Sequence, residues 1–315
     1  MSKKTSRQTL FSIARYFFSG FAMGSADLVP GVSGGTIALI LGIYEKLIKS
    51  IKLVTHDTLK LALRFKLKEA FLSVPWLFLL SLFAGMLTAI ATLSGLIEYL
   101  LETQPVGIWS FFFGLVFASV FLVGAKVKSW QALYLFLAVL SAIEAYLLVG
   151  LVPLETAPTL INFFISGAIA IVAMILPGIS GSFMLIIMGK YGQILGAVND
   201  HNFLVLGAFM IGAVVGLALF SKLLNFLFKN YHDGMMAVLA GFLFGSLRKV
   251  WPWKEVTQTV VDSHGQVIPV AFKNILPNEQ VALAFSLMLV GVMLVMGMHF
   301  LGKRIKHVGS GFDLD

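Results

Sequence analysis

Residues 27–44 read DLVPGVSGGTIALILGIY, and a close copy, MILPGISGSFMLIIMGKY, occupies residues 174–191 in the second half of the chain. Each copy has an apolar run, a Pro-Gly-x-Ser-Gly break and a second apolar run that ends in Gly-x-Tyr. Irregular backbone inside a hydrocarbon layer survives only where protein or a polar cavity satisfies its N–H and C=O groups. Paired interruptions in corresponding halves of a membrane protein point to a substrate site between the halves. We call residues 30–34 and 177–181 the first and second breaks and interpret the chain around them.

The composition is that of an integral membrane protein. Of the 315 residues, 58% are hydrophobic and 12% are charged, whereas soluble domains have about 25% charged residues. The net charge of +8 fits basic loops that fix the orientation of the spans, so we expect no nucleic-acid partner. The chain has no cysteine, which excludes thiolate metal sites, and we expect no metal and no cofactor. Arg15 and Asp27 interrupt the first apolar run, which favours an uncleaved first segment over a signal peptide.

These features predict an all-α polytopic membrane protein made of two duplicated halves. Gly85 and Ser94 of the first half match Gly212 and Ser221 of the second. Three apolar spans separate the two breaks. Because this number is odd, the second half enters the membrane from the opposite side, which predicts an inverted-topology tandem repeat. The apolar arm at 36–44 is about 14 Å long, half the hydrocarbon thickness, which favours a re-entrant helical hairpin over two full spans.

We expect the first repeat at 1–152 and the second at 153–315, each with a re-entrant hairpin and about three transmembrane helices. The predicted segments are a hairpin around 10–50, an interfacial amphipathic insert at 52–70, spans within 75–152, a hairpin around 158–198, spans within 202–301 and an extracytoplasmic loop at 254–280. Cytoplasmic N- and C-termini place most of the 23 basic residues on the cytoplasmic side. Charge does not separate re-entrant from spanning hairpins, because both have the same parity.

The breaks contain the residue types of an anion site. Glycines allow successive N–H groups to point at one ligand, each following helix start adds unpaired donors, and hydroxyls lie beside them. The candidate headgroup residues are Pro30, Gly31, Ser33, Gly34, Gly35, Thr36, Pro177, Gly178, Ser180, Gly181 and Ser182. The alternative is that these small residues only allow helices to cross closely.

Three ionisable residues interrupt apolar sequence. Asp27 is interpreted as a site for H⁺ or Na⁺, or alternatively as a cap on the neighbouring helix. Glu144 is either a second proton site or a hydrogen-bond partner between helices. Arg15 either extends its side chain to the interface or guides an anionic headgroup. No HxxxH or HExxH pattern occurs and no carboxylate pair lies near a break, so we predict no catalytic residues and a conduit, not an enzyme.

The segments MGSADLVPGVSGGTIALILGIYEKLI at 23–48 and LPGISGSFMLIIMGKY at 176–191 resemble the PopT family of polyprenyl-phosphate transporters, also known as domain-of-unknown-function family 368. The resemblance covers essentially the whole chain. It implies a multi-pass flippase of the bacterial inner membrane that returns undecaprenyl phosphate, a carrier lipid for peptidoglycan and other envelope polymers, from the outer to the cytoplasmic leaflet. It also implies that Asp27 and the residues of the two breaks form the functional core.

The physical properties of this substrate agree with such a design. A phosphate headgroup cannot easily cross hydrocarbon, whereas the prenyl tail can stay in the membrane lipid throughout. Alternating access of the two leaflets to one site would lower the barrier. Because the anion moves inward against a negative-inside potential, at about 2.3 kcal/mol per charge per 100 mV, we hypothesise that H⁺ or Na⁺ is co-transported through Asp27 or Glu144.

Two alternatives remain open. PGVSGGT also resembles the Pro-Gly-x-Ser-Arg-Ser segment of undecaprenyl-pyrophosphate phosphatases of the BacA type, which are likewise inverted-repeat membrane proteins. Gly34 and Gly181 occupy the position of the arginine, and no glutamate pair precedes either break, so hydrolysis lacks its charge clamp and its acid or base. A cation-coupled transporter of a small soluble anion differs only in lacking a lateral opening to lipid.

Overall fold

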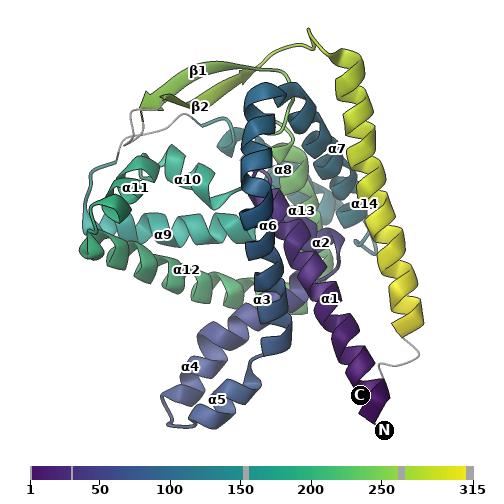
Figure 1. Ribbon diagram of the computed structural model, residues 1–315, viewed down its shortest axis with the longest axis vertical. Helices are drawn as coiled ribbons and strands as arrows, with labels where there is room; N and C mark the ends of the chain where they lie inside the picture. Colours follow the sequence, from purple (N-terminus) through teal and green to yellow (C-terminus); the bar gives the residue numbers. More distant parts are fainter. Residues whose placement is uncertain (1, 30, 152–155, 262–266, 310–315) are drawn as a thin grey trace.

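The computed structural model describes residues 2–29, 31–151, 156–261 and 267–309, and most of this chain is helical (Figure 1). Pro30 lies outside the described residues. The first half contains α1 (Ser2–Asp27), α2 (Gly34–Ile40), α3 (Tyr44–Lys52), the π-helical turn η1 (Leu53–Asp57), α4 (Thr58–Ala62), α5 (Leu67–Ser73), α6 (Trp76–Thr103), α7 (Pro105–Gly124) and α8 (Ala132–Leu148). The second half contains α9 (Leu160–Ile175), α10 (Gly181–Ile187), α11 (Tyr191–Asn199), α12 (Phe203–Asn230), α13 (His232–Ser246), β1 (Lys254–Val261), β2 (Val267–Asn274) and α14 (Val281–Gly309).

Four of the described helices are long and apolar enough to cross a membrane. They are α6, α7, α12 and the Val281–Phe300 part of α14. The apolar helices α8 and α9 are shorter, and α10 with α11 forms a pair bent by 103°. The prediction of a mainly helical, multi-pass membrane protein is therefore confirmed.

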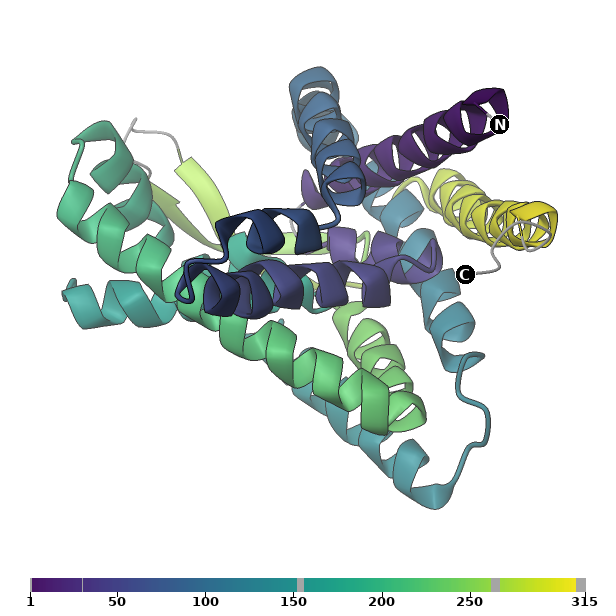
Figure 2. The same cartoon turned by 90° about the horizontal axis from the view of Figure 1, so that it is seen from below.

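Both halves contain the same close-packed helix pair. α1 packs along α6 in the first half, purple and blue in Figure 1 and Figure 2, and α9 packs along α12 in the second. Gly20 and Gly85 make the first contact and Gly167 and Gly212 make the second, because a Cβ on any of them would overlap a backbone carbonyl of the facing helix. Small residues allow this approach in membranes, where lipid tails compete equally for apolar side chains.

The remaining long helices pair across the halves. α7 of the first half packs on α14 of the second, and α8 of the first half packs on α13 of the second. Gly114 and Gly241, which match in the sequence repeat, lie against the backbone carbonyls of Met288 and Ala138. Each of these two pairs contains one helix from each half. The helices around the two breaks therefore form one framework.

Each break is a tight turn followed by a short helix. Gly31 and Gly178 have φ values of 89° and 86°, and Gly42 and Gly189, which follow α2 and α10, have values of 69° and 64°. Glycine adopts these left-handed conformations at little steric cost. α2 and α10 have 7 residues each, about 10 Å or a third of the hydrocarbon thickness. The sequence repeat is thus also a repeat of backbone conformation.

The insert at 52–70 differs from the single amphipathic helix that we predicted. It contains η1, α4 and the start of α5, and the chain reverses between the two short helices. Arg64 N and Lys66 N both donate to Leu61 O, at 3.1 and 3.0 Å, which stabilises the reversal. Phe65 has a φ of 57° at this turn, and its side chain is 92% exposed. Its position on a membrane surface stays a prediction.

The polar stretch 254–280 is not a plain loop, and the all-α prediction is wrong at this point. β1 and β2 form an antiparallel hairpin at the end of the long axis opposite α4 and α5 (Figure 1). Five of the eight residues of KEVTQTVV are β-branched, which is a strand signal. Two tryptophans hold the base of the hairpin, because Trp251 Nε1 donates to Ile275 O at 3.0 Å and Trp253 Nε1 donates to Glu279 O at 2.9 Å.

Gly212→Ala tests the close packing of α12 on α9. The added methyl group would overlap Phe164 O, so we expect a loss of about 1–3 kcal/mol and a lower unfolding temperature in detergent. Gly207→Ala on the same helix is the matched control, because no atom lies within 4 Å of its Cβ position and alanine has the higher helix propensity. Equal unfolding temperatures for both variants would contradict the close contact.

Candidate functional site

The first break and the end of α9 contact each other in the interior. Ser33 Oγ donates to Met174 O at 3.3 Å, and Tyr44 Oη donates to Ile175 O at 3.1 Å. Gly35 also faces this carbonyl, since a Cβ there would lie 2.7 Å from Ile175 O. The last carbonyls of a helix have no partner within the helix, so they need such external donors. The first break therefore stabilises the end of the helix that leads into the second.

Asp27 caps α2. Its Oδ1 accepts a hydrogen bond from Gly34 N at 2.6 Å, and Ser33 Oγ accepts one from Gly35 N at 3.1 Å. The carboxylate thus fills the space in front of α2, where we expected an anion, and the cap interpretation of Asp27 agrees with the structure. Within the described part of the chain, no Lys, Arg or His forms an ion pair with Asp27. Among the described residues, the one hydrogen bond that stabilises its negative charge comes from Gly34 N.

The first break is buried in all its described residues, whereas the end of the second break is partly exposed. Ser33 and Thr36 are 1% and 0% exposed, and Thr36 Oγ1 has no hydrogen-bond partner among the described atoms. In the second break Met174 replaces Asp27, Ser180 is half-buried and Ser182 is exposed. Ser180 Oγ accepts a hydrogen bond from Phe183 N and lies 3.3 Å from Ser182 Oγ. Duplicated sequence has thus produced two breaks with different access to a ligand.

Both breaks pack against the end of α13 and the turn that follows it. A Cβ on Gly178 would lie 2.5 Å from Ser246 Oγ, and a Cβ on Gly31 would overlap the Lys249 side chain. Because glycine is needed at both turns for its positive φ as well, these two positions tolerate no larger residue. The segment 246–254 is therefore the shared neighbour of the two breaks.

This segment forms a small basic pocket with a volume of about 80 Å³. Its lining includes three cations, a hydroxyl and an amide, and it includes no carboxylate. The lining residues are Val149, Gly150, Leu151, Phe183, Arg248, Lys249, Lys254, Thr257, Phe272 and Asn274. Its size suits a group the size of a few water molecules, such as one phosphate.

The three cations of the basic pocket differ in how they are held. Arg248 Nη1 donates to Tyr146 O at 2.9 Å. Lys254 Nζ donates to Lys249 O and lies 3.5 Å from the centre of the Trp109 ring. Lys249 Nζ lies 3.9 Å from the centre of the Phe183 ring, and among the described residues no acceptor bonds to it. By contrast, the buried Lys190 Nζ donates to three oxygens at 2.8 Å. Lys249 is therefore the ammonium that is left for a ligand.

Burial makes this pocket receptive to an anion. It lowers the pKa of Lys249 from 10.5 to about 8. Burial, and then the nearby charge of Lys249, lowers the pKa of Lys254 well below its usual value. A bound anion would favour the charged forms of both lysines, and a phosphate would accept charge-assisted hydrogen bonds from them.

The sequence did not single out these cations. Arg248, Lys249 and Lys254 counted only as charges on the extracytoplasmic side, although three cations and two tryptophans within 248–254 directly after an apolar helix were a visible signal. The structure does not bring Arg15 or Glu144 to the breaks. Arg15 lies about 18 Å along α1 from Asp27, and Glu144 lies on the exposed face of α8.

A second polar cavity of about 610 Å³ lies at the opposite end of the molecule, where α3 continues through η1 to α4 (Figure 1). Its lining includes four lysines and two acids. The charged residues are Glu45, Lys46, Lys49, Lys52, Asp57 and Lys229. Tyr44, the first residue of α3, donates to Ile175 O, which links this end of the molecule to the helix that leads into the second break.

A multi-pass helical protein with two broken helices in contact, and a cationic pocket beside both breaks, belongs to the class of membrane proteins that handle an anionic substrate. More specifically, the chain belongs to the VCA0040-like family, described as undecaprenyl phosphate translocase-like, whose model matches residues 23–268. The resemblance noted from the two breaks is thereby confirmed.

Two curated relatives carry the same name. A polyprenyl-phosphate transporter of Vibrio cholerae serotype O1 is 45% identical over 291 residues, which cover 90% of this chain and 94% of the relative. A polyprenyl-phosphate transporter of Staphylococcus aureus is 35% identical over 254 residues, which cover 74% of this chain and 84% of the relative. No solved structure matches this chain.

Lys249 should give anion binding a pH dependence. Its pKa of about 8 means that the ammonium is present below pH 8 and lost above it. A soluble phosphate monoester has its second pKa near about 6 and stays a dianion above pH 7, so only the protein titrates there. Affinity measured by calorimetry should fall above pH 8, by up to about tenfold per pH unit.

Lys249→Arg is the control, because the guanidinium stays charged across this range. We expect this variant to lose the part of the pH dependence centred near 8. A wild-type profile as flat as that of Lys249→Arg would remove Lys249 from the anion site.

Proposed function

We propose that this protein is a lipid transporter that moves undecaprenyl phosphate from the outer to the cytoplasmic leaflet of the bacterial inner membrane, so that the carrier lipid is reused. The observation that carries the proposal is the basic pocket, in which Arg248, Lys249 and Lys254 lie beside both breaks without a carboxylate in the lining. The names of the two relatives support a polyprenyl phosphate as the substrate. The chemistry agrees, because a phosphate monoester is a dianion that three cations can bind.

The basic pocket is the proposed entry site for the headgroup. Most basic residues of the chain belong to the side that we assign to the cytoplasm, and the pocket lies at the other end, below the β-hairpin. From there the headgroup passes Phe183 and the partly exposed end of the second break, with the hydroxyls of Ser180 and Ser182, on its way to the first break. The cavity with four lysines near η1 is the proposed exit. The predicted headgroup residues of both breaks, and Arg15 nearer the cytoplasmic end, belong to this path.

An inverted repeat with halves at 1–152 and 153–315 explains how both leaflets reach one path. The α1–α6 and α9–α12 pairs are equivalent in packing, and the turns at Gly31 and Gly178 have the same backbone conformation. The short α2 and α10 favour re-entrant hairpins over full spans. Cytoplasmic N- and C-termini follow from the positive-inside rule. Rocking of one helix pair against the other would then open the path to each leaflet in turn.

Asp27 is the proposed coupling site for H⁺ or Na⁺. Its carboxylate is half-buried, accepts one hydrogen bond from Gly34 N, and has no basic ion-pair partner within the described chain. An acid of this kind inside a membrane requires a proton or a cation. Inward movement of each negative charge against 100 mV requires about 2.3 kcal/mol, which one co-transported cation would offset. The exposed Glu144 is the weaker candidate for this role.

Hydrolysis has less support. A phosphatase would need a cation in the break itself, at Gly34 or Gly181, yet a Cβ at Gly34 would lie 2.5 Å from Asp27 Oδ2 and one at Gly181 would lie 2.7 Å from Ala170 O. No arginine fits at either position. The relatives are also named transporters, which agrees with a protein that is not an enzyme.

The first experiment follows labelled undecaprenyl phosphate between the leaflets of liposomes that contain the purified protein. Lys249→Ala should slow the movement at least about tenfold, since a charged hydrogen bond is worth about 1.5–3 kcal/mol. Lys273→Ala is the matched control, because Lys273 is an exposed lysine of the β-hairpin that follows Lys249. Release of phosphate from undecaprenyl pyrophosphate in the same liposomes would favour the enzyme, and no movement in the wild type would refute the transporter.

Asp27→Asn separates coupling from stability. The asparagine oxygen can accept the same hydrogen bond from Gly34 N, so thermal stability should stay close to wild type, whereas Asp27→Ala should lose about 1 kcal/mol. Under imposed H⁺ and Na⁺ gradients, Asp27→Asn should carry the lipid without responding to either gradient. An unchanged response of Asp27→Asn would exclude Asp27 as the coupling site.

A further inference from the structure

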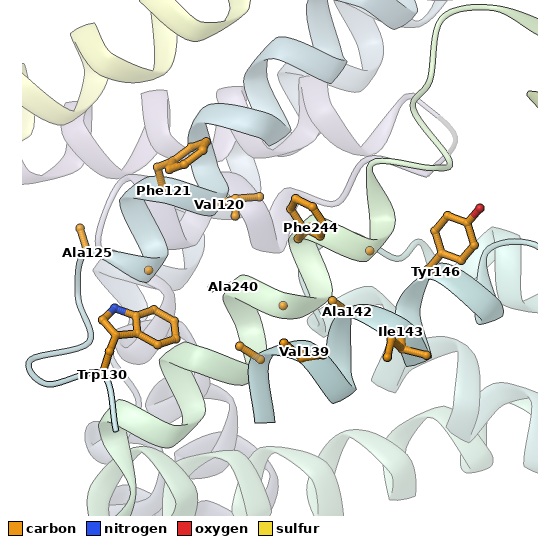
Figure 3. A pocket seen from close by; sticks show the side chains of 14 residues that line it. Val120, Phe121, Ala125, Trp130, Val139, Ala142, Ile143, Tyr146, Ala240 and Phe244 are labelled. Atoms are coloured by element: carbon orange, nitrogen blue, oxygen red, sulfur yellow. The ribbon is translucent and has the colours of Figure 1, made fainter. Parts of the chain in front are cut away.

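An apolar groove of about 670 Å³ runs between α7, α8 and α13 (Figure 3). Its floor is made of small residues, among them Ala142, Gly241 and Gly245. The two glycines allow α13 to pack closely on α8, since a Cβ on either would overlap an α8 carbonyl. The side chains of Val139, Ile143 and Phe244, each more than half exposed, stand along its walls. The floor is therefore fixed by close helix packing, while the open side faces the surface.

The groove lies next to the basic pocket. Trp130 lies at one end of the groove and Tyr146 at the other (Figure 3). The Tyr146 ring lies 4.4 Å from Arg248 Cζ, and Tyr146 O accepts a hydrogen bond from Arg248 Nη1. Arg248 lines the basic pocket, as does Gly150, four residues after Tyr146, where a Cβ would overlap the guanidinium. A cationic site for one small anionic group thus lies beside an apolar groove, and the contact between Tyr146 and Arg248 lies between the two.

The two parts together define the ligand. A soluble anion would use the basic pocket and leave the groove without a role. A phospholipid has two chains and a headgroup substituent, and the basic pocket, at about 80 Å³, is too small for more than a phosphate and a few neighbouring atoms. A lipid with a single chain and an unsubstituted phosphate as its headgroup fits both parts.

We propose that the groove receives the isoprene units next to the phosphate of the substrate while the phosphate lies in the basic pocket. This inference rests on the proposed function and adds the binding site of the tail. Lipid tails are as apolar as the groove, so the groove contributes little affinity from burial alone. It instead aligns the first part of the chain with the headgroup and leaves the rest in the bilayer, which lets the chain follow the headgroup sideways out of the protein.

Ile143→Trp tests this role by filling the groove. The matched control is Leu147→Trp, which places the same ring on the same helix at an exposed position outside the groove. We expect Ile143→Trp to bind a soluble phosphate monoester as the wild type does, within about twofold, and to move undecaprenyl phosphate between leaflets at least about tenfold more slowly, since a blocked alignment acts on the transition and not on the headgroup site. Leu147→Trp should match the wild type in both measurements.

A photoreactive polyprenyl phosphate with its reactive group in the first isoprene units gives a direct readout. We expect labelling of α8 or α13 around Val139, Ile143 and Phe244, and loss of this labelling with the polyprenol that lacks the phosphate. Equal labelling by the alcohol, or normal transport by Ile143→Trp, overturns the tail site while lipid movement by the wild type leaves the proposed function intact. Absence of lipid movement in the wild type would refute the proposed function itself.

Discussion

The structure depends on one constraint: a helix interrupted inside an apolar protein must find partners for the backbone groups that the interruption exposes. The first break meets this requirement partly at the end of α9, the helix that leads into the second break. Ser33 and Tyr44 donate to the last carbonyls of α9, and the Asp27 carboxylate accepts from the first N–H of α2. The breaks therefore form one unit, in which a movement of one half changes the hydrogen bonds of the other.

That unit needs a rigid frame, and the glycine contacts supply it. α1 with α6 and α9 with α12 approach closely enough for backbone to touch backbone, and α7, α8, α13 and α14 pair across the two halves. In a membrane, where burial of apolar side chains does not drive association, such packing is a main source of helix attraction. The glycines also leave the grooves beside the helices open, so one packing solution gives both the frame and the apolar groove.

The charged groups near the breaks, unlike the backbone groups, lack partners of opposite charge among the described residues. The carboxylate of Asp27 lies within the breaks with no basic ion-pair partner among the described residues, and the cations of the basic pocket lie next to the breaks without a carboxylate in the lining. Leaving half-buried charges uncompensated costs stability. The chain retains them beside the duplicated turns at Gly31 and Gly178, which is the arrangement expected where a charged substrate and a cation supply the missing partners.

The apolar helices, the two breaks, their duplication and the family could all be predicted from the sequence. Hydropathy, glycine turns and repeated motifs are properties of neighbouring residues, so a linear pattern reveals them. The sequence also suggested both roles of Asp27, but it did not reveal that the carboxylate fills the start of α2. Only the tertiary structure brought Lys249 against Gly31 and Phe183, and Arg248 against Tyr146. Those contacts join residues up to 218 positions apart in the numbering of the chain. They arise from the tertiary packing of separate segments, which local sequence patterns do not encode.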